Sequence, residues 1–191
     1  MNLSPNTLVD WDNFCRESCE EVMLRRSTPI GGPGIRVQID ESKFGKRKYH
    51  RGHRVEGQWV FGGIEEGSRR NFMVPVEKRD RNTLIPIIVK WIAPGSTIIS
   101  DCWKPYDILS EMGYQYLKVN HSIEYVNTNG DHTNKIEGHW RQAKSKLPSF
   151  GTRKHLFSSH LAEFMWRYAN REQDLFDTII HDISSVYNIE S

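Results

Sequence analysis

The sequence has 191 residues and a net charge of +2, and 37 % of its residues are hydrophobic. This is enough apolar material for one domain of ordinary size, which excludes a generally disordered chain. No apolar run approaches the roughly 18 residues that a membrane-spanning helix needs, and the N-terminus lacks the basic and then apolar pattern of a secretory signal. We therefore expect a soluble intracellular protein, nuclear in a eukaryote and cytoplasmic in a bacterium.

The charge is unevenly distributed along the chain. Residues 43–54 contain six Lys or Arg and no acid, and residues 132–154 contain six more against a single acid. Residues 161–191 reverse the sign, with six acids and two Arg. Two basic stretches on a nearly neutral chain favour a local surface that binds a polyanion, with ordinary solvated charge as the alternative.

The three cysteines are Cys15, Cys19 and Cys102, an odd number and too few for a disulfide framework. Cys15 and Cys19 have the spacing of half a zinc site, but no Cys or His pair follows at the spacing of a zinc finger. We expect these cysteines to be small buried residues instead.

The elements predicted in chain order begin with a helix over residues 7–26, which a Pro- and Gly-rich segment at 29–34 terminates. The periodicity then predicts strands at 35–40, 58–64 and 72–76, a helix at 82–91, a strand at 97–100, a helix at 106–112, a strand at 116–119, and helices at 134–147, 155–170 and 173–187. Three meandering strands followed by alternating helices and strands indicate an α/β protein with a mixed sheet flanked by helices. The ribonuclease-H-like fold has this order.

Two aspartates fall at the ends of predicted neighbouring strands. Asp40 ends the first strand and Asp101 the fourth, and these strands lie side by side and parallel in the expected topology. Two carboxylates so close together repel each other unless a cation lies between them, which favours Mg²⁺ or Mn²⁺. With a third oxygen ligand, such a site could hold two ions for phosphodiester chemistry.

Glu137 is the candidate for the third ligand because it lies near the start of a strongly predicted helix. At 100° per residue, Glu137, Arg141 and Lys144 share one stripe of this helix. The apolar residues of the helix form a separate stripe, which we expect to pack on the sheet. An acid for metal followed by two cations for phosphate is a coherent nucleic-acid site. A surface ion pair between Glu137 and Arg141 is the simpler alternative.

Other acids and histidines fit a metal site less well. Strand alternation places Glu41 on the face opposite Asp40, and Asp107 is expected on the exposed side of a helix. The remaining candidates lie in the polar loop before the 134–147 helix, where solvated side chains are the rule: His121, Glu124, Asp131 and His132.

Five sequence runs resemble the transposases of the Merlin superfamily and the related bacterial insertion-sequence transposases. They occur in the same order across about 130 residues: IDESKFGKRKYHRGHRVEGQWVFGGIEEG (39–67), SDCWKPYDIL (100–109), VNHSIEYVN (119–127), HTNKIEGHWRQAK (132–144) and LAEFMWR (161–167). The resemblance implies a ribonuclease-H-like domain that uses Mg²⁺ to cut DNA at the ends of an element and join its 3′ ends to a target.

The resemblance also implies which residues act. Asp40 in the IDES run, Asp101 in SDCW and Glu137 in TNKIEGHW correspond to the DDE triad, which is catalytic and holds two metal ions. Some bacterial relatives have asparagine as the third residue, which makes Asn134 an alternative. The implied partners are transposon-end and target DNA, with a homo-oligomer as a reasonable assembly. The expected DNA-binding residues are Lys43, Lys46, Arg47, Lys48, Arg51, Arg54, Arg141 and Lys144.

The expected domains are a helical segment at 1–30, a catalytic domain at 31–172 and a C-terminal helix or tail at 173–191. Related transposases carry an N-terminal zinc ribbon or helix-turn-helix, and 1–30 has room only for a remnant of one. The sequence therefore leaves two alternatives to an active transposase domain. One is a catalytically silent DNA-binding protein derived from a transposase, and the other is a stand-alone nuclease acting on RNA–DNA hybrids.

Overall fold

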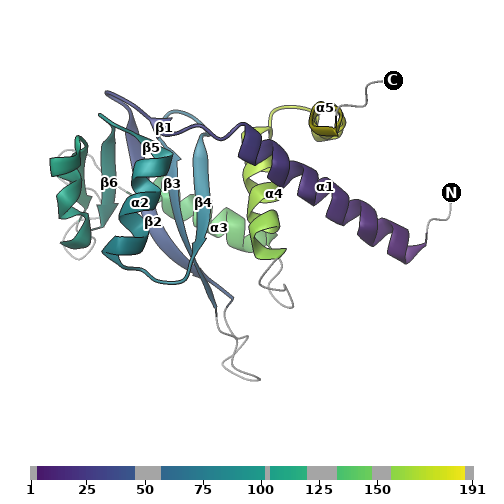
Figure 1. Ribbon diagram of the computed structural model, residues 1–191, viewed down its shortest axis with the longest axis horizontal. Coiled ribbons are helices and arrows are strands. Elements are labelled where there is room, and N and C mark those ends of the chain that lie inside the picture. The colour runs from purple at the N-terminus through teal and green to yellow at the C-terminus, as the bar shows by residue number, and fades with distance from the viewer. Residues whose placement is uncertain (1–3, 46–56, 102–103, 120–132, 148–155, 188–191) are drawn as a thin grey trace. The chain divides into compact units, whose positions relative to one another are not determined.

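The computed structural model describes residues 4–45, 57–101, 104–119, 133–147 and 156–187 (Figure 1). The chain divides into two compact units. Residues 28–151 contain the β-sheet, and residues 1–27 together with 152–191 contain three helices. The helix predicted at 155–170 therefore groups with the first and last helices, although the expected catalytic domain at 31–172 includes it.

The sheet unit is built on five strands in the order β4-β3-β2-β6-β7. β3 is antiparallel to both β2 and β4, whereas β6 runs parallel to β2 and β7 runs parallel to β6. These strands span Arg36–Phe44 (β2), Gln58–Glu65 (β3), Asn71–Val76 (β4), Thr97–Asp101 (β6) and Gln115–Val119 (β7). A separate parallel pair, β1 (Ile30–Gly31) and β5 (Ile92–Ala93), was not predicted because two residues show no periodicity.

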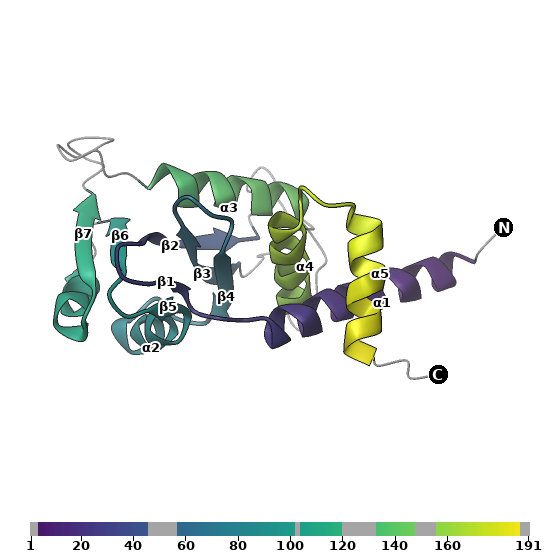
Figure 2. The same ribbon diagram turned by 90° about the horizontal axis from the view of Figure 1, so that it is seen from above.

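Helices cover both faces of this sheet (Figure 2). α2 (Arg81–Trp91) lies on one face and α3 (Asn134–Lys146) on the other, with the 3₁₀ helix η2 (Lys104–Met112) between β6 and β7 in the chain. The main core lies on the α2 face, where Val37 and Ile39 of β2 pack with Leu84 and Ile88 of α2. The predicted fold class is confirmed: an α/β, ribonuclease-H-like mixed sheet flanked by helices.

One strand is longer than the sequence predicts. β2 does not end at Asp40 but continues to Phe44, because its antiparallel pairing with β3 continues to Phe44 opposite Gln58. The parallel neighbour β6 ends at Asp101, so the last part of β2 extends past the parallel half of the sheet. Asp40 therefore lies inside a strand, close to the point where its parallel neighbour ends.

The helical unit consists of α1 (Pro5–Arg25), α4 (Phe157–Ala169) and α5 (Leu175–Tyr187). Its small core contains Cys19 from α1, which is buried as predicted, together with Trp166. Cys15 was also expected to be buried but is only partly so. Asp182 of α5 is 1 % exposed and accepts hydrogen bonds from Trp166 Nε1 (2.8 Å) and from the guanidinium of Arg26. Within the described ranges, no helix combines the length and apolar character needed to cross a membrane.

The first prediction concerns two glycines of the sheet unit. A Cβ at Gly62 would lie 2.5 Å from the ring of Trp140, whereas a Cβ at Gly138 on α3 has nothing within 4 Å. Gly62→Ala is expected to destabilise the protein by about 1–3 kcal/mol through overpacking. Gly138→Ala is expected to stabilise it by about 0.5–1 kcal/mol because alanine restricts the unfolded chain. Urea unfolding of the whole chain tests both, and equal effects would contradict the packing described for Gly62.

The second prediction concerns the buried carboxylate of the helical unit. Asp182→Ala removes the acceptor of the Trp166 indole and leaves a buried donor unpaired, which we expect to cost about 2 kcal/mol. Asp10→Ala, at an exposed position of α1, is the matched control and should change stability by less than about 0.5 kcal/mol. Urea unfolding followed by circular dichroism at 222 nm compares them. An Asp182→Ala protein as stable as the control would exclude a stabilising role for this hydrogen bond.

Candidate active site

Asp40 is held in place from the α3 side of the sheet. The indole Nε1 of Trp140 donates a hydrogen bond of 3.0 Å to Asp40 Oδ2. The cross-strand partner of Asp40 is Gly62, whose missing side chain leaves room for the Trp140 ring against β3. The small residue on β3 thus allows the indole to lie against the sheet and reach the carboxylate.

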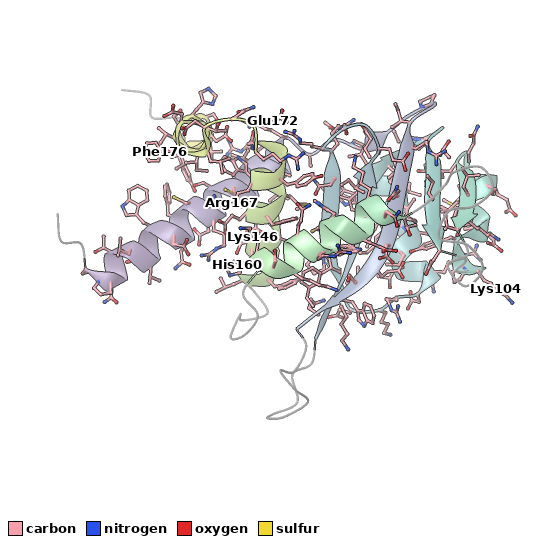
Figure 3. The ribbon with its side chains drawn as sticks, turned by 180° about the vertical axis from the view of Figure 1, so that it is seen from behind. Lys104, Lys146, His160, Arg167, Glu172 and Phe176 are labelled. Atoms are coloured by element: carbon pink, nitrogen blue, oxygen red, sulfur yellow. The ribbon has the colours of Figure 1, made fainter. Side chains whose placement is uncertain are left out.

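Two further hydrogen bonds join the same face of β2 to α3. The side-chain oxygen of Gln38 accepts from the backbone N–H groups of Lys135 (3.1 Å) and Ile136 (3.0 Å), at the start of the helix. Near its other end, Lys144 Nζ donates to Ser42 Oγ at 2.6 Å. Alternate β2 residues 38, 40 and 42 therefore bind successive turns of α3, which Figure 3 shows crossing the sheet toward the labelled Lys146. This pattern sets the register between helix and strand.

Asp101 lies at the same level of the sheet as Asp40. β6 is parallel to β2 with Ile99 opposite Gln38, and the same register extended by two residues places Asp101 level with Asp40. Asp101 is the last residue of its strand and is exposed. The first and fourth predicted strands are therefore adjacent and parallel, as expected.

The charges of the three predicted acids act on one another. The pKa of Asp40 is raised to about 6: burial has the largest effect and the negative charges of Asp101 and Glu137 also raise it, whereas the backbone hydrogen bond at Glu41 and the Trp140 indole lower it. A half-buried carboxylate near two other carboxylates is most easily deprotonated when a cation compensates the repulsion. Asp101 and Glu137 therefore lie close enough to Asp40 for their charges to act on it.

Glu137 begins the outer stripe of α3 that the sequence predicts. It is exposed in the first turn, and Thr133 Oγ1 lies 3.2 Å from its Oε1 as a hydrogen-bond donor. Arg141 and Lys144 of this stripe are also exposed, and the apolar stripe is buried as predicted. The buried residues are Ile136, Trp140, Ala143 and Leu147.

The donor set fits a hard divalent cation. Three carboxylates supply oxygen ligands of the kind that Mg²⁺ and Mn²⁺ prefer. Among the described residues, however, no three Asp, Glu, His or Cys side chains converge on one point at metal-binding distance. The charges of Asp101 and Glu137 thus act on Asp40, but the three carboxylates do not meet at a single metal-binding point in the described structure.

Glu41 lies on the opposite face from Asp40, as strand alternation predicts. Its carboxylate accepts a hydrogen bond from the Tyr106 hydroxyl. The pKa of Glu41 is raised to about 7: burial has the largest effect and the charges of Asp40 and Asp101 also raise it, whereas the Tyr106 hydrogen bond and the positive charge of Arg79 lower it. Glu41 is therefore a half-buried acid on the face of β2 opposite α3.

The remaining predicted residues separate into two groups. Asp107 is exposed as expected and forms an ion pair with Lys118 at 2.6 Å. Asn134 is exposed at the first position of α3, and Lys43 is exposed on β2. The others lie outside the described residues: Lys46, Arg47, Lys48, Arg51, Arg54, Cys102, His121, Glu124, Asp131 and His132.

Sequence reasoning missed the residues that support Asp40. Trp140 was assigned to the apolar stripe of α3, and nothing local shows that its indole nitrogen reaches Asp40. Gln38 and Ser42 alternate with Asp40 on the polar face of a predicted strand, so their common orientation was the available signal. Their partners on α3 are nearly 100 residues away in sequence.

Comparisons with known proteins found one relative by sequence and similar solved structures. An uncharacterised transposase-like protein of Haemophilus influenzae is 32 % identical over 102 residues, covering 53 % of this chain and 82 % of the relative. Two solved structures are more distant. The catalytic core of bovine immunodeficiency virus (BIV) integrase is 10 % identical, with a TM-score of 0.46 over 80 % of this chain and 97 % of its own. The HTLV-2 integrase catalytic core, solved with magnesium, is 12 % identical, with a TM-score of 0.38 over 74 % and 87 %.

The family comparison covers the whole of the sheet unit and continues to the end of α4. Residues 27–169 match the pattern described as the ISXO2-like transposase domain, which is well over half of the chain. These residues include β2, β6 and α3, and with them all three acids and Trp140. The chain therefore belongs to the ISXO2-like transposase domain family, a family of insertion-sequence transposases.

Proposed function

We propose that this chain is a DDE transposase catalytic domain that cleaves DNA and transfers the cut strand to a target. Asp40, Asp101 and Glu137 are its catalytic residues and would hold two Mg²⁺ or Mn²⁺ ions. The observation that carries the proposal is the state of Asp40, which is half-buried, oriented by Trp140, and raised in pKa by Asp101 and Glu137 as well as by burial. A negative charge on a carboxylate in this position is unfavourable by itself and becomes favourable when a cation binds beside it.

The reaction consists of two in-line displacements at phosphorus. In the first, a water oxygen attacks the phosphate at the end of the element and the P–O3′ bond breaks, which leaves a free 3′-hydroxyl. In the second, that hydroxyl oxygen attacks a target phosphate and displaces its 3′ oxygen. The bound ions would supply activation of the attacking oxygen and stabilisation of the leaving one.

The chain's own residues position the carboxylates and the DNA. Trp140 donates its hydrogen bond to Oδ2 of Asp40 and makes no such bond to Oδ1. Arg141 and Lys144 lie on the same stripe of α3 as Glu137 and would bind the phosphate backbone beside the scissile bond. Lys144 reaches Ser42 through its ammonium group, which keeps a positive charge near Asp40 on the same face of β2.

Several finer assignments belong to this proposal. The resemblance of the five sequence runs supports a place among Merlin-type transposases, with residues 31–172 as the catalytic region and 1–30 as a remnant DNA-binding segment. The proposed partners are transposon ends and target DNA, bound by a homo-oligomer. The proposed location is the cytoplasm of a bacterium or the nucleus of a eukaryote.

One observation favours the alternative of a catalytically silent DNA-binding protein. Across the part of the chain that the structure describes, the acidic side chains do not close into a three-ligand metal cluster. The presence of all three acids at the expected positions argues against this alternative, since a silent protein has no need of a half-buried carboxylate with a raised pKa.

The third prediction tests the triad by nicking of supercoiled plasmid in Mn²⁺. Asp101→Asn and Glu137→Ala are each expected to lower the nicking rate by more than about 100-fold. Removing a residue that only orients a metal ligand costs up to about 100-fold, and removing a ligand itself should cost more. Asp107→Asn is the matched control, because Asp107 is an exposed acid paired with Lys118 outside the proposed site, and should retain the wild-type rate.

Two outcomes of this assay would contradict the proposal. Normal nicking by the Asp101→Asn protein would exclude Asp101 as a catalytic residue. A folded wild-type chain that binds duplex DNA without nicking it in Mn²⁺ or Mg²⁺ would support the silent DNA-binding protein instead.

The fourth prediction tests the positioning of Asp40. Trp140→Phe keeps an aromatic ring against Gly62 but removes the indole N–H, so we expect the nicking rate to fall by about 10–100-fold. The Mn²⁺ concentration for half-maximal rate should rise as well, because Asp40 is less well oriented. Trp91→Phe is the control, since Trp91 stacks on Phe72 away from the acids. A Trp140→Phe protein with an unchanged Mn²⁺ dependence would show that the indole only fills space.

A further inference from the structure

A second group of functional side chains lies on the face of β2 opposite Asp40. Lys43 and Trp59 are cross-strand partners on β2 and β3. Arg79, just before α2, places its guanidinium 3.8 Å from the centroid of the Trp59 ring, and Lys43 Nζ lies 5.6 Å from the same centroid. Two cations therefore contact one indole, and we call these three residues the Trp59 patch.

The contact with the ring leaves the polar groups of both cations available. An arginine at this distance from an indole is attracted to the face of the ring. This contact uses the flat side of the guanidinium and leaves the N–H groups at its edge available for other partners. Both cations are exposed, and neither forms an ion pair with a carboxylate in the ranges that the structure describes. By contrast, the exposed side chains of Arg70 and Lys118 are paired with acids.

The acids nearest to the patch are already engaged by other groups. Glu41 is half-buried and accepts the hydrogen bond of Tyr106, although the charge of Arg79 also acts on it. Asp80 accepts from the backbone N–H and the hydroxyl of Thr83 at 2.9 and 2.8 Å, and so begins α2. The patch therefore presents two exposed positive charges beside one indole.

We propose that the Trp59 patch binds the phosphate backbone of duplex DNA, as a contact distinct from the Asp40 site. Lys43 lies three residues beyond Asp40 on the same strand, so their backbones are about 10 Å apart along it, with the two side chains on opposite faces. Duplex DNA bound at the acids would therefore have phosphates within reach of the patch. The planar N–H edge of Arg79 suits bidentate contact with a phosphate.

The sequence around the patch favours DNA over an acidic peptide as the ligand. Lys43 begins the stretch 43–54, which contains six Lys or Arg and no acid. A run of this length matches an extended polyanion better than a short acidic segment. The role in transposition rests on the proposed function, whereas DNA binding by the patch is measurable without catalysis.

Fluorescence anisotropy of a labelled 30-base-pair duplex tests the patch, with the whole chain in EDTA at several KCl concentrations. Arg79→Ala and Lys43→Ala are each expected to weaken binding about 5-fold and to reduce the slope of log K against log salt by about 0.9, the value for one lost phosphate contact. Lys90→Ala is the matched control, because Lys90 is an exposed lysine 5.5 Å from the ring of Trp91, and should bind like the wild type.

A second arm separates geometry from charge. Arg79→Lys keeps the charge but loses the planar edge, so we expect an unchanged salt slope with intermediate affinity. Equal binding by the Arg79→Ala, Lys90→Ala and wild-type proteins would overturn the inference, as would a wild-type chain that does not bind the duplex.

These outcomes are distinct from failure of the proposed function. A chain that binds DNA through the patch but never nicks plasmid would contradict the transposase chemistry and support the patch. A chain that nicks normally, with the same dependence on DNA concentration after Arg79→Ala, would contradict the patch alone.

Discussion

The side-chain contact between β2 and α3 is the constraint on which the candidate site depends. Two residues of a strand span about 6.6–6.8 Å, and four residues of a helix span about 6 Å. These spacings nearly match, so the alternate β2 residues Gln38, Asp40 and Ser42 can each meet a successive turn of α3. The helix that carries Glu137 is thereby placed over the strand that carries Asp40.

This arrangement has an electrostatic cost that the packing must offset. Asp40 is half-buried and surrounded by the charges of Asp101 and Glu137, and its raised pKa expresses that cost. The Trp140 hydrogen bond opposes the shift, and the apolar stripe of α3 supplies favourable burial around it. Stability from the helix–sheet contact thus offsets the unfavourable half-burial of one carboxylate near two other acids, and perturbed carboxylates of this kind are common at functional sites.

The sequence predicted the elements better than their contacts. Periodicity located every strand of the main sheet, and the parallel adjacency of β2 and β6 followed from the order of the elements. The extension of β2 to Phe44 depends on pairing with Gln58, which no local pattern reveals. The same holds for the indole of Trp140 and for Arg79 on Trp59, because both contacts join elements that are distant in sequence.

The extra length of β2 gives the two faces of the strand different roles. β6 ends at Asp101, so the segment of β2 after Asp40 loses its parallel neighbour while it remains paired with β3. Side chains on this segment alternate, with Ser42 toward α3 and Lys43 toward Trp59. A shift of one residue in the β2–β3 register would exchange these faces and remove Asp40 from Trp140. One register therefore determines both the orientation of the carboxylate and the position of the basic patch.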